Sequence, residues 1–199
     1  MDSMHYDGPI YPITAPLIGI TGKKGSGKDT VAGLLQRNWF WTPCAFAGEL
    51  KAIAKRLWDL SEDQVNGSIQ EKERVDPRWG CSPRHLLQTL GTEAGRAAHP
   101  ETWIRFLLQQ IAQKDQPVDF HHPPRAGWVV TDVRFPNEAS AIRKHGGVIW
   151  RVERDGGTGH YTDHASETSI DLIVPDRIIL NDGTLDDLWA KISGVKSQH

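Results

Sequence analysis

The sequence has little cysteine and no large excess of charge of either sign. Two of its 199 residues are cysteine, Cys44 and Cys81, and they form no CxxC pair. Free thiols of this kind indicate a reducing compartment. Lysine and arginine number 23 against 25 aspartate and glutamate residues. This balance argues against a protein that coats nucleic acid or lies on a membrane surface, because both need an excess of basic charge.

The sequence also lacks any apolar run as long as a membrane span, and it shows no signal peptide. We therefore expect a cytoplasmic protein that binds neither a membrane nor a nucleic acid. A length of 199 residues is suited to one domain with a real hydrophobic core. The polar, proline-containing residues 1–16 are expected to form a flexible N-terminal arm.

The most informative stretch covers residues 17–38. Residues 17–20 are a short apolar run, which predicts a buried parallel strand, and residues 30–38 favour a helix. Between them, Gly22, Gly27 and Lys28 have the G-x-x-x-x-G-K spacing of a phosphate-binding loop. The alternative dinucleotide-binding pattern, G-x-G-x-x-G, does not fit, because Thr30 stands where the third glycine belongs.

Such a loop binds phosphate for physical reasons. Glycines adopt positive φ, which brings several backbone N–H groups within reach of phosphate oxygens, and the following helix adds its positive end. Lys28 supplies a full positive charge. The residue after this lysine is usually a serine or threonine that binds Mg²⁺, but here it is Asp29, followed by Thr30. Asp29 could hold the ion or cap the helix, and the sequence leaves both open.

A second informative segment is the helix predicted over residues 83–98, where Ser82 caps and Pro83 begins the helix. Two glycines one turn apart, Gly91 and Gly95, indicate the close approach of a ligand or of another helix. Polar residues recur every four positions and form one stripe, which suits phosphate binding or, alternatively, an ordinary solvated surface. These residues are Arg84, Gln88, Thr92 and Arg96.

Further strands are expected at residues 43–47, 128–132, 148–153 and 177–180, with a mobile connection at residues 66–81. The third strand ends in Asp132, and Arg134 and Glu138 follow at the same strand–helix junction. Carboxylates at such strand ends organise Mg²⁺ or substrate in phosphate-loop enzymes. Lys51 lies close to the end of the second strand, where α/β proteins bind ligands. Residues 154–163 suggest a lid, and we do not interpret His160 and His164 as a metal site.

Several segments together resemble the bacteriophage deoxynucleoside monophosphate kinases. They are GKKGSGKDT, SPRHLLQTLGTEAGR, TDVRFPNEASAI, HASE and NDGTLDDLW, which occur in the family's order between residues 17 and 193. The resemblance implies a phosphate-loop (P-loop NTPase) α/β fold of the nucleoside-monophosphate-kinase type, with a five-stranded parallel sheet flanked by helices. It implies one kinase domain over residues 17–199, with an acceptor-binding helical region at about 61–115 and a lid-like loop at about 154–165.

The resemblance also implies the chemistry: transfer of the γ-phosphoryl group of ATP, with Mg²⁺, to a deoxynucleoside 5′-monophosphate in the cytoplasm of a phage-infected or lysogenic cell. Lys28, Arg84, Asp132 and Arg134 would be catalytic, and Asp29 would bind the metal. The implied ATP-binding residues are Gly22, Lys24, Gly25, Ser26, Gly27, Lys28, Asp29 and Thr30. The implied acceptor-binding residues are Lys51, Arg84, Gln88, Thr92, Arg96, Trp103, Asp132, Arg134 and Glu138, although Trp103 also suits a core aromatic.

Three alternatives remain at this level. Animal-type phosphomevalonate kinases share the GKD loop and would act on another small phosphorylated acceptor. A nucleotide-dependent switch or motor is disfavoured, because the sequence has neither an Asn-Lys-x-Asp guanine motif nor a basic track. A nucleotide-binding module without catalysis is the third. The oligomeric state is open, with a homodimer as one option.

Overall fold

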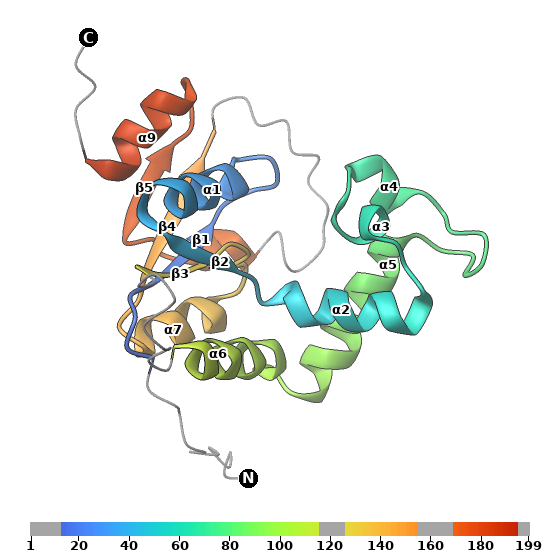
Figure 1. Cartoon of the computed structure of the whole chain (residues 1–199). Coiled ribbons are helices and arrows are strands. Elements are labelled where there is room, and N and C mark those ends of the chain that lie inside the picture. Colours follow the sequence, from blue (N-terminus) through green and yellow to red (C-terminus); the bar gives the residue numbers. More distant parts are fainter. Residues whose placement is uncertain (1–12, 116–125, 155–168, 195–199) are drawn as a thin grey trace, which may run out of the picture.

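A five-stranded, all-parallel sheet forms the centre of the molecule (Figure 1). The computed structural model describes residues 13–115, 126–154 and 169–194. The strand order is β2-β3-β1-β4-β5, which confirms the predicted fold class. The strands are β1 (Leu17–Thr21), β2 (Trp41–Cys44), β3 (Gly127–Val130), β4 (Val148–Glu153) and β5 (Arg177–Leu180).

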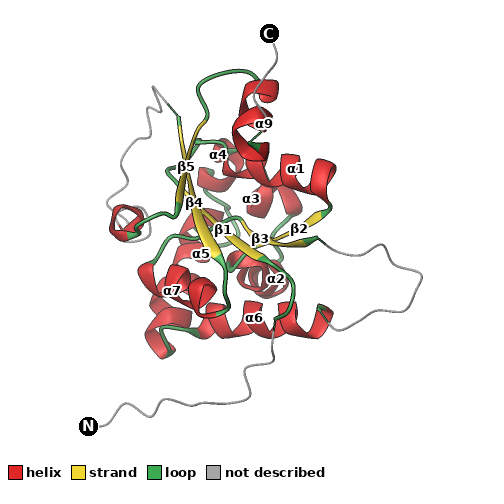
Figure 2. Ribbon diagram, turned by 90° about the vertical axis from the view of Figure 1, so that its left-hand side faces the viewer, coloured by secondary structure: helices red, strands yellow, loops and turns green. Residues whose placement is uncertain are grey.

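Helices cover both faces of this sheet (Figure 2). Helices α1 (Lys28–Trp39) and α9 (Leu185–Ser193) lie on one face, and α6 (Thr102–Lys114) and α7 (Pro136–Lys144) lie on the other. The short 3₁₀ helix η2 (Ser169–Leu172) precedes β5. No helix within the described residues is long and apolar enough to cross a membrane.

A group of helices extends beyond the sheet edge (Figure 1). It consists of α2 (Ala47–Trp58), α3 (Glu62–Asn66), α4 (Ile69–Glu73), α5 (Pro83–Gln88) and the π-helix η1 (Thr89–Arg96). These helices have a small core of their own around Ala54, Val65 and Leu86. Local caps fix their starts, because the hydroxyls of Ser61, Ser68 and Ser82 each accept a hydrogen bond from the N–H three residues later.

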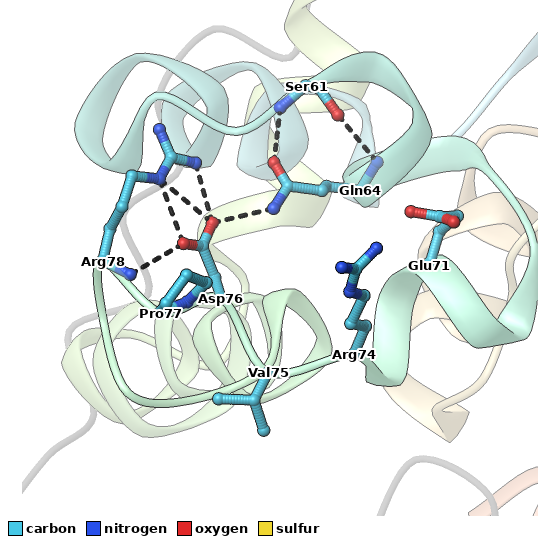
Figure 3. A pocket seen from close by; sticks show the side chains of 8 residues that line it. All are labelled: Ser61, Gln64, Glu71, Arg74, Val75, Asp76, Pro77 and Arg78. Carbon is cyan, nitrogen blue, oxygen red and sulfur yellow. Dashed lines mark hydrogen bonds and ion pairs between the residues drawn. The ribbon is translucent and has the colours of Figure 1, made fainter.

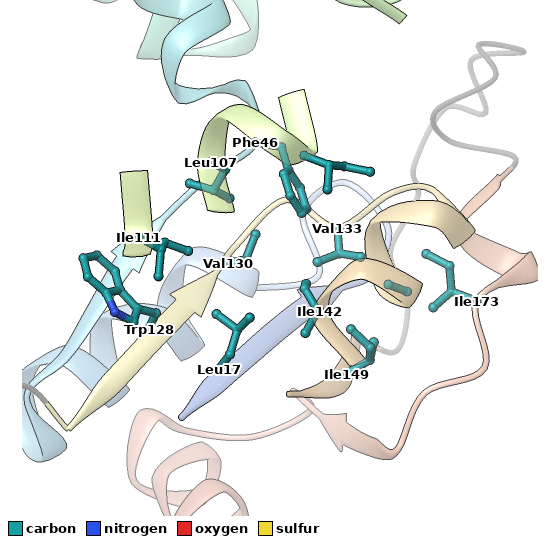
Figure 4. Close-up of a cluster of buried hydrophobic side chains, with 12 residues drawn as sticks. Leu17, Phe46, Leu107, Ile111, Trp128, Val130, Val133, Ile142, Ile149 and Ile173 are labelled. Carbon is teal, nitrogen blue, oxygen red and sulfur yellow. The ribbon is translucent and has the colours of Figure 1, made fainter. Parts of the chain in front are cut away.

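The main core consists of two layers, one on each face of the sheet. Figure 4 shows the layer between the sheet, α6 and α7, which contains Trp128 of β3 and Ile142 of α7. Alternation along β1 sends Leu17 into this layer and Ile18 and Ile20 into the layer beneath α1 and α9. A parallel strand that is buried on both faces consists of a continuous run of apolar residues, and this pattern allows such strands to be predicted from the sequence.

Three predicted boundaries are wrong. The second strand is residues 41–44 rather than 43–47, because α2 already begins at Ala47. The third strand ends at Val130, before Asp132. Residues 66–81 are not a plain connection, since they contain α4 and a bridge between Asp76 and Cys81.

The predicted N-terminal arm is also wrong for its last four residues. The Asp115 carboxylate accepts hydrogen bonds from the N–H groups of Thr14 and Ala15, at 2.6 and 3.0 Å, and from the Thr14 hydroxyl. The Pro16 carbonyl accepts one from the Trp128 N–H at 2.8 Å. Residues 1–12 lie outside the described residues, as does the predicted lid except for the exposed Arg154. His160 and His164 lie outside them too.

Candidate active site

The loop between β1 and α1 has the geometry of a phosphate cradle. Gly22, Gly25 and Gly27 have φ angles of 143°, 79° and 101°, a region that side chains other than glycine rarely adopt. A Cβ atom at Gly22 would clash with the Val152 carbonyl of β4, so only glycine fits there. The loop leads directly into α1, whose first-turn N–H groups have no acceptor within the helix and whose dipole is positive at this end.

Two side chains of the loop suit a phosphate ligand. The Lys28 ammonium reaches across the loop and donates to the carbonyls of Gly22 and Lys23, at 2.7 and 2.8 Å. Ser26 is 5% exposed, and its hydroxyl has no hydrogen-bond partner among the described residues. A buried hydroxyl without a partner costs roughly 1–3 kcal/mol, which a ligand oxygen would offset. Lys24 is exposed beside them.

The residues beside the loop also fit a magnesium ion that arrives with a nucleotide. Asp29 is exposed in the first turn of α1, and Thr30 is half-buried beside it. Within the described ranges no group of three or more histidine, cysteine, aspartate or glutamate residues could hold a metal. Mg²⁺ in kinases typically needs only one or two protein ligands, because substrate phosphates supply the others.

Asp132 holds the start of α2. Its two carboxylate oxygens accept from the N–H groups of Phe46 and Ala47, at 2.8 and 2.9 Å. Since the N-cap residue itself provides no side-chain acceptor, a residue 86 positions away performs the capping. Asp132 therefore fixes the helix that carries Lys51, whose ammonium donates to the Asn66 side chain at 2.9 Å.

The two glycines of η1 meet neighbouring helices. A Cβ atom at Gly91 would lie 2.7 Å from Leu50 of α2, and one at Gly95 would lie 2.5 Å from the Trp103 ring of α6. The Trp103 indole also donates to the Gly91 carbonyl at 2.9 Å. Helix packing therefore accounts for both glycines and for Trp103. A contact between Trp103 and the base of the acceptor stays a prediction.

Arg96 is held by the start of α7. Its guanidinium donates to Glu138 at 3.1 Å and to Asn137 at 3.0 Å, and it lies 3.7 Å over the Phe135 ring. The other Glu138 oxygen accepts from the N–H groups of Arg134 and Phe135. The structure thus brings three predicted site residues together: Arg96, Arg134 and Glu138.

Glu138 is 5% exposed, and burial raises the pKa of its carboxyl to about 7. The nearby charge of Asp132 raises this pKa further, whereas the N–H donors and Arg96 lower it. A buried carboxyl in this range can change its protonation near neutral pH.

Arg84 lies at the other end of this helical segment from Arg96, and it forms an ion pair with Glu73 of α4. Gln88 and Thr92 are half-buried between the two arginines. The structure therefore separates the predicted polar stripe into an Arg84 end, next to α4, and an Arg96 end, next to α7.

The Lys72 ammonium, on α4, lies within electrostatic range of both the Arg84 end and the phosphate loop. Burial lowers the pKa of the Lys72 ammonium, and the charges of Lys51, Arg84 and Lys24 lower it further, while Asp29 raises it. Charges from α2, from α5 and from the phosphate loop therefore all act on the Lys72 ammonium. Figure 1 shows the loop before α1 pointing toward α3 and α4.

Two residues of this region were not predicted. Lys72 lies in the stretch interpreted as a connection, although Ser68 and Glu71 have the S-x-x-E spacing of a helix start. Asn181, directly after β5, donates to the Ser26 carbonyl at 2.9 Å. Its place at the carboxyl end of a parallel strand was the available signal.

A cavity of about 340 Å³ lies between α3, α4 and the turn after α4 (Figure 3). Asp76 lines it and accepts hydrogen bonds from Arg78 at 2.7 Å and from Gln64 at 2.8 Å, and these bonds hold the pKa of Asp76 well below its usual range. No predicted site residue lines this cavity. It is separate from the site at the phosphate loop.

Known proteins with similar sequences carry the names of one kind of kinase. A protein of Acanthamoeba polyphaga mimivirus named for deoxynucleotide monophosphate kinase activity is 33% identical over 193 residues, covering 88% of this chain and 93% of that protein. The deoxynucleoside-5′-monophosphate kinase of Escherichia phage T5 is 44% identical over 93 residues, 44% of this chain and 34% of that enzyme. The deoxynucleotide monophosphate kinase of Enterobacteria phage T4 is 28% identical over 120 residues, 59% of this chain and 46% of that enzyme.

Two solved structures are also similar. Protein TT1252 from Thermus thermophilus is 16% identical with a TM-score of 0.48, over 92% of this chain and 99% of that one. Dephospho-CoA kinase from Campylobacter jejuni is 14% identical with a TM-score of 0.46, over 91% and 95% of the two chains.

The family model for deoxynucleotide monophosphate kinase matches residues 65–192, a range that includes the Arg84 end, the start of α7 and the strand before Asn181. Together with the mimivirus relative, which aligns over most of both chains, this match shows that the chain belongs to the deoxynucleotide monophosphate kinase family.

Proposed function

We propose that this protein transfers the γ-phosphoryl group of ATP to a deoxynucleoside 5′-monophosphate and releases the diphosphate and ADP. One observation carries the proposal: the glycine-rich loop before α1 has positive φ angles and the Lys28 ammonium held across it, and it lies within electrostatic range of Lys72, on which Lys51 and Arg84 also act. Phosphoryl transfer needs positioning and charge neutralisation more than covalent chemistry, and two opposed anion sites supply both.

On the donor side, the loop from Gly22 to Thr30 would bind the ATP phosphates. The backbone N–H groups at the start of α1 would donate to phosphate oxygens, the buried Ser26 hydroxyl would donate as well, and Lys28 would exchange its loop carbonyls for phosphate oxygens. Asp29 and Thr30 would hold Mg²⁺. When bound, the ion neutralises charge on the phosphate oxygens.

On the acceptor side, Arg84, Lys51 and Lys72 would surround the monophosphate, since the charges of Arg84 and Lys51 both act on the Lys72 ammonium. Arginine suits phosphate because its planar fork donates two hydrogen bonds. Arg96, Arg134 and Glu138 would shape the acceptor site from the start of α7, with Gln88 and Thr92 between the two ends. Asp132 would act by holding α2 and, through it, Lys51.

The acceptor needs no general base. A phosphate monoester has its second pKa near 6, so at neutral pH it presents an ionised oxygen. That oxygen attacks the γ-phosphorus, a new P–O bond forms, and the bond to the bridging β–γ oxygen breaks with ADP as the leaving group. The protein orients the two partners in line and excludes water from the γ-phosphorus.

Phosphomevalonate is the second candidate acceptor, because it too is a small phosphate monoester. The family match favours the nucleotide. A cytoplasmic location is part of the proposal, since Cys44 and Cys81 are both free thiols.

Replacing the loop lysine tests the donor side. In Lys28→Ala, turnover with ATP and any deoxynucleoside monophosphate should fall by a factor of about 10² or more, because charge on the transferring group loses a full positive partner. Circular dichroism should show an unchanged fold. Steady-state assays against all four monophosphates and phosphomevalonate also identify the acceptor. Equal turnover of Lys28→Ala and wild type would refute the mechanism.

Arg84→Ala and Lys72→Ala test the acceptor side. Each should raise KM for the monophosphate about tenfold or more and change KM for ATP little, because a charge-assisted contact is worth roughly 1.5–3 kcal/mol. Arg105→Ala is a matched control, because Arg105 pairs with Glu101 on the exposed side of α6. A rise in KM for ATP alone would place these cations on the donor side.

A further inference from the structure

We infer that Asn181 is a positioning residue for ATP: it holds the Ser26–Gly27 peptide so that the Gly27 N–H points into the phosphate loop. This inference rests on the proposed function, since it assigns a residue to the same site. The side-chain amide of Asn181 donates to the Ser26 carbonyl at 2.9 Å, from a position 155 residues away in the chain.

The orientation follows from peptide geometry. The described residues contain no cis peptide bond, and in a planar trans peptide the carbonyl and the N–H point in opposite directions. The Ser26 carbonyl is drawn outward by Asn181, so the N–H of the same peptide is directed inward. A hydrogen bond to the carbonyl therefore fixes a phosphate donor without touching the phosphate.

Asn181 can do this because its own backbone is fixed. Its N–H donates to the Glu153 carbonyl at 2.7 Å, which continues the pairing of β4 with β5. The preceding carbonyl, of Leu180, accepts from the Lys191 ammonium of α9 at 3.0 Å, and Lys191 also pairs with Asp182. The anchor is thus part of the sheet and of the last helix, and it does not depend on the loop.

Gly27 and Asn181 also fit each other closely. A Cβ atom at Gly27 would clash with the Asn181 amide nitrogen. Gly27 is therefore required twice, once by its positive φ of 101° and once by the approach of this side chain. An amide oxygen at this place would repel the Ser26 carbonyl, so the amide nitrogen must face it.

The test is Asn181→Asp, which keeps the shape of the side chain and removes the donor. Isothermal titration should show ATP affinity reduced about tenfold or more, the scale of one hydrogen bond to a charged group. Affinity for the monophosphate should be unchanged. The matched control is Asn38→Asp, because the Asn38 amide likewise donates to a backbone carbonyl at 2.9 Å, that of Leu34, on the far part of α1.

Asn181→Ala serves as a second variant with no charge introduced, and it should show the same selective loss. Wild-type ATP affinity in both Asn181 variants would overturn the inference and leave the proposed function intact. An equal loss of ATP and monophosphate binding, or unfolding of both variants, would also overturn it, because Asn181 would then support the fold in general. A wild-type protein that does not bind ATP would overturn the proposed function itself.

Discussion

Arg96 and Glu138 show what a single residue gains from its surroundings. In the sequence, Arg96 ends a polar stripe suited to phosphate, and Glu138 follows an apolar strand. In the structure they are bound to each other over a separation of 42 residues, with Phe135 under the guanidinium. The residue types were predicted as a site, but their pairing was not, because periodicity carries no information on distant contacts.

The raised pKa of Glu138 predicts a pH dependence of stability. Its folded-state pKa of about 7 exceeds the ordinary value of 4.5, so the folded protein binds this proton more tightly than the unfolded chain. The contribution is fully present below about pH 4.5 and is lost as pH rises through 7, at up to about 1.4 kcal/mol per pH unit. Between pH 5 and 7, the unfolding free energy of wild type should therefore fall relative to that of Glu138→Gln, as measured by urea denaturation.

Glu62→Gln is the control for this pH series. Hydrogen bonds from Lys55 and Asn66 lower the pKa of Glu62, so this group titrates below the window and its variant should follow wild type between pH 5 and 7. Parallel profiles of wild type and Glu138→Gln across the window would show that the Glu138 carboxyl is not perturbed.

At the scale of elements, the segment from Pro83 to Arg96 departs most from its sequence pattern. The pattern predicts one α-helix, and the structure has an α-helical start followed by η1, in which hydrogen bonds run to the fifth residue. π-helical turns are rare and occur frequently at functional sites. Here the indole N–H of Trp103 and the hydroxyl of Thr102 each donate to an η1 carbonyl. Side chains of α6 thus help to hold this geometry, which the sequence of η1 alone does not encode.

The close contact of η1 with α6 predicts that Gly95→Ala destabilises the protein by up to about 2 kcal/mol, because overpacking usually costs about 1–3 kcal/mol and part of this is offset. A Cβ atom 2.5 Å from the Trp103 ring cannot be accommodated without moving one helix, and this cost should exceed the roughly 1 kcal/mol gained in helix propensity. Chemical denaturation followed by circular dichroism measures the difference.

Gly48→Ala is the matched control, because Gly48 is exposed in α2 and a Cβ there has no atom within 4 Å. That variant should be neutral or stabilised. A Gly95→Ala variant at least as stable as Gly48→Ala would show that η1 and α6 can separate at no cost.

At the scale of the whole molecule, the chain closes on itself at Asp115. This residue ends α6, and its carboxylate binds Thr14, Ala15 and the Trp128 indole, so it joins the segment before β1 to α6 and β3. Burial raises the pKa of the Asp115 carboxyl, and the hydrogen bonds from these donors lower it. The hydrogen bonds together have the larger effect, so the pKa lies below its ordinary value.

Asp115→Ala should lower the unfolding free energy by about 2 kcal/mol, because several donors lose one acceptor and each net hydrogen bond contributes roughly 0.5–1.5 kcal/mol. Thr14→Val removes only the hydroxyl contact at 2.9 Å and should cost less than half as much. Thermal and urea unfolding of the two variants provide the comparison. An Asp115→Ala variant no less stable than Thr14→Val would mean that residues 13–16 contribute little to the fold.

Features that depend on neighbours in the chain could be predicted from the sequence. The glycine spacing and the lysine of the phosphate loop, the apolar runs of the strands, and the helix start at Ser82 are all local. The Ser82 hydroxyl accepts the predicted capping hydrogen bond, from the His85 N–H in its own helix turn. A turn, a cap and a buried strand need only a few consecutive residues, so sequence reasoning reaches them.

Contacts between groups that are far apart in the chain could not be predicted in this way. Asp132 caps a helix that begins 85 residues earlier, and Asn181 binds a loop 155 residues earlier. Arg84 forms its ion pair with α4, whereas Arg96 forms its ion pair with α7. Each arrangement depends on the packing of α2, α6, α7 and α9 around the sheet. Such contacts are set by the order of strands and the approach of helices, which a local pattern of residues does not specify.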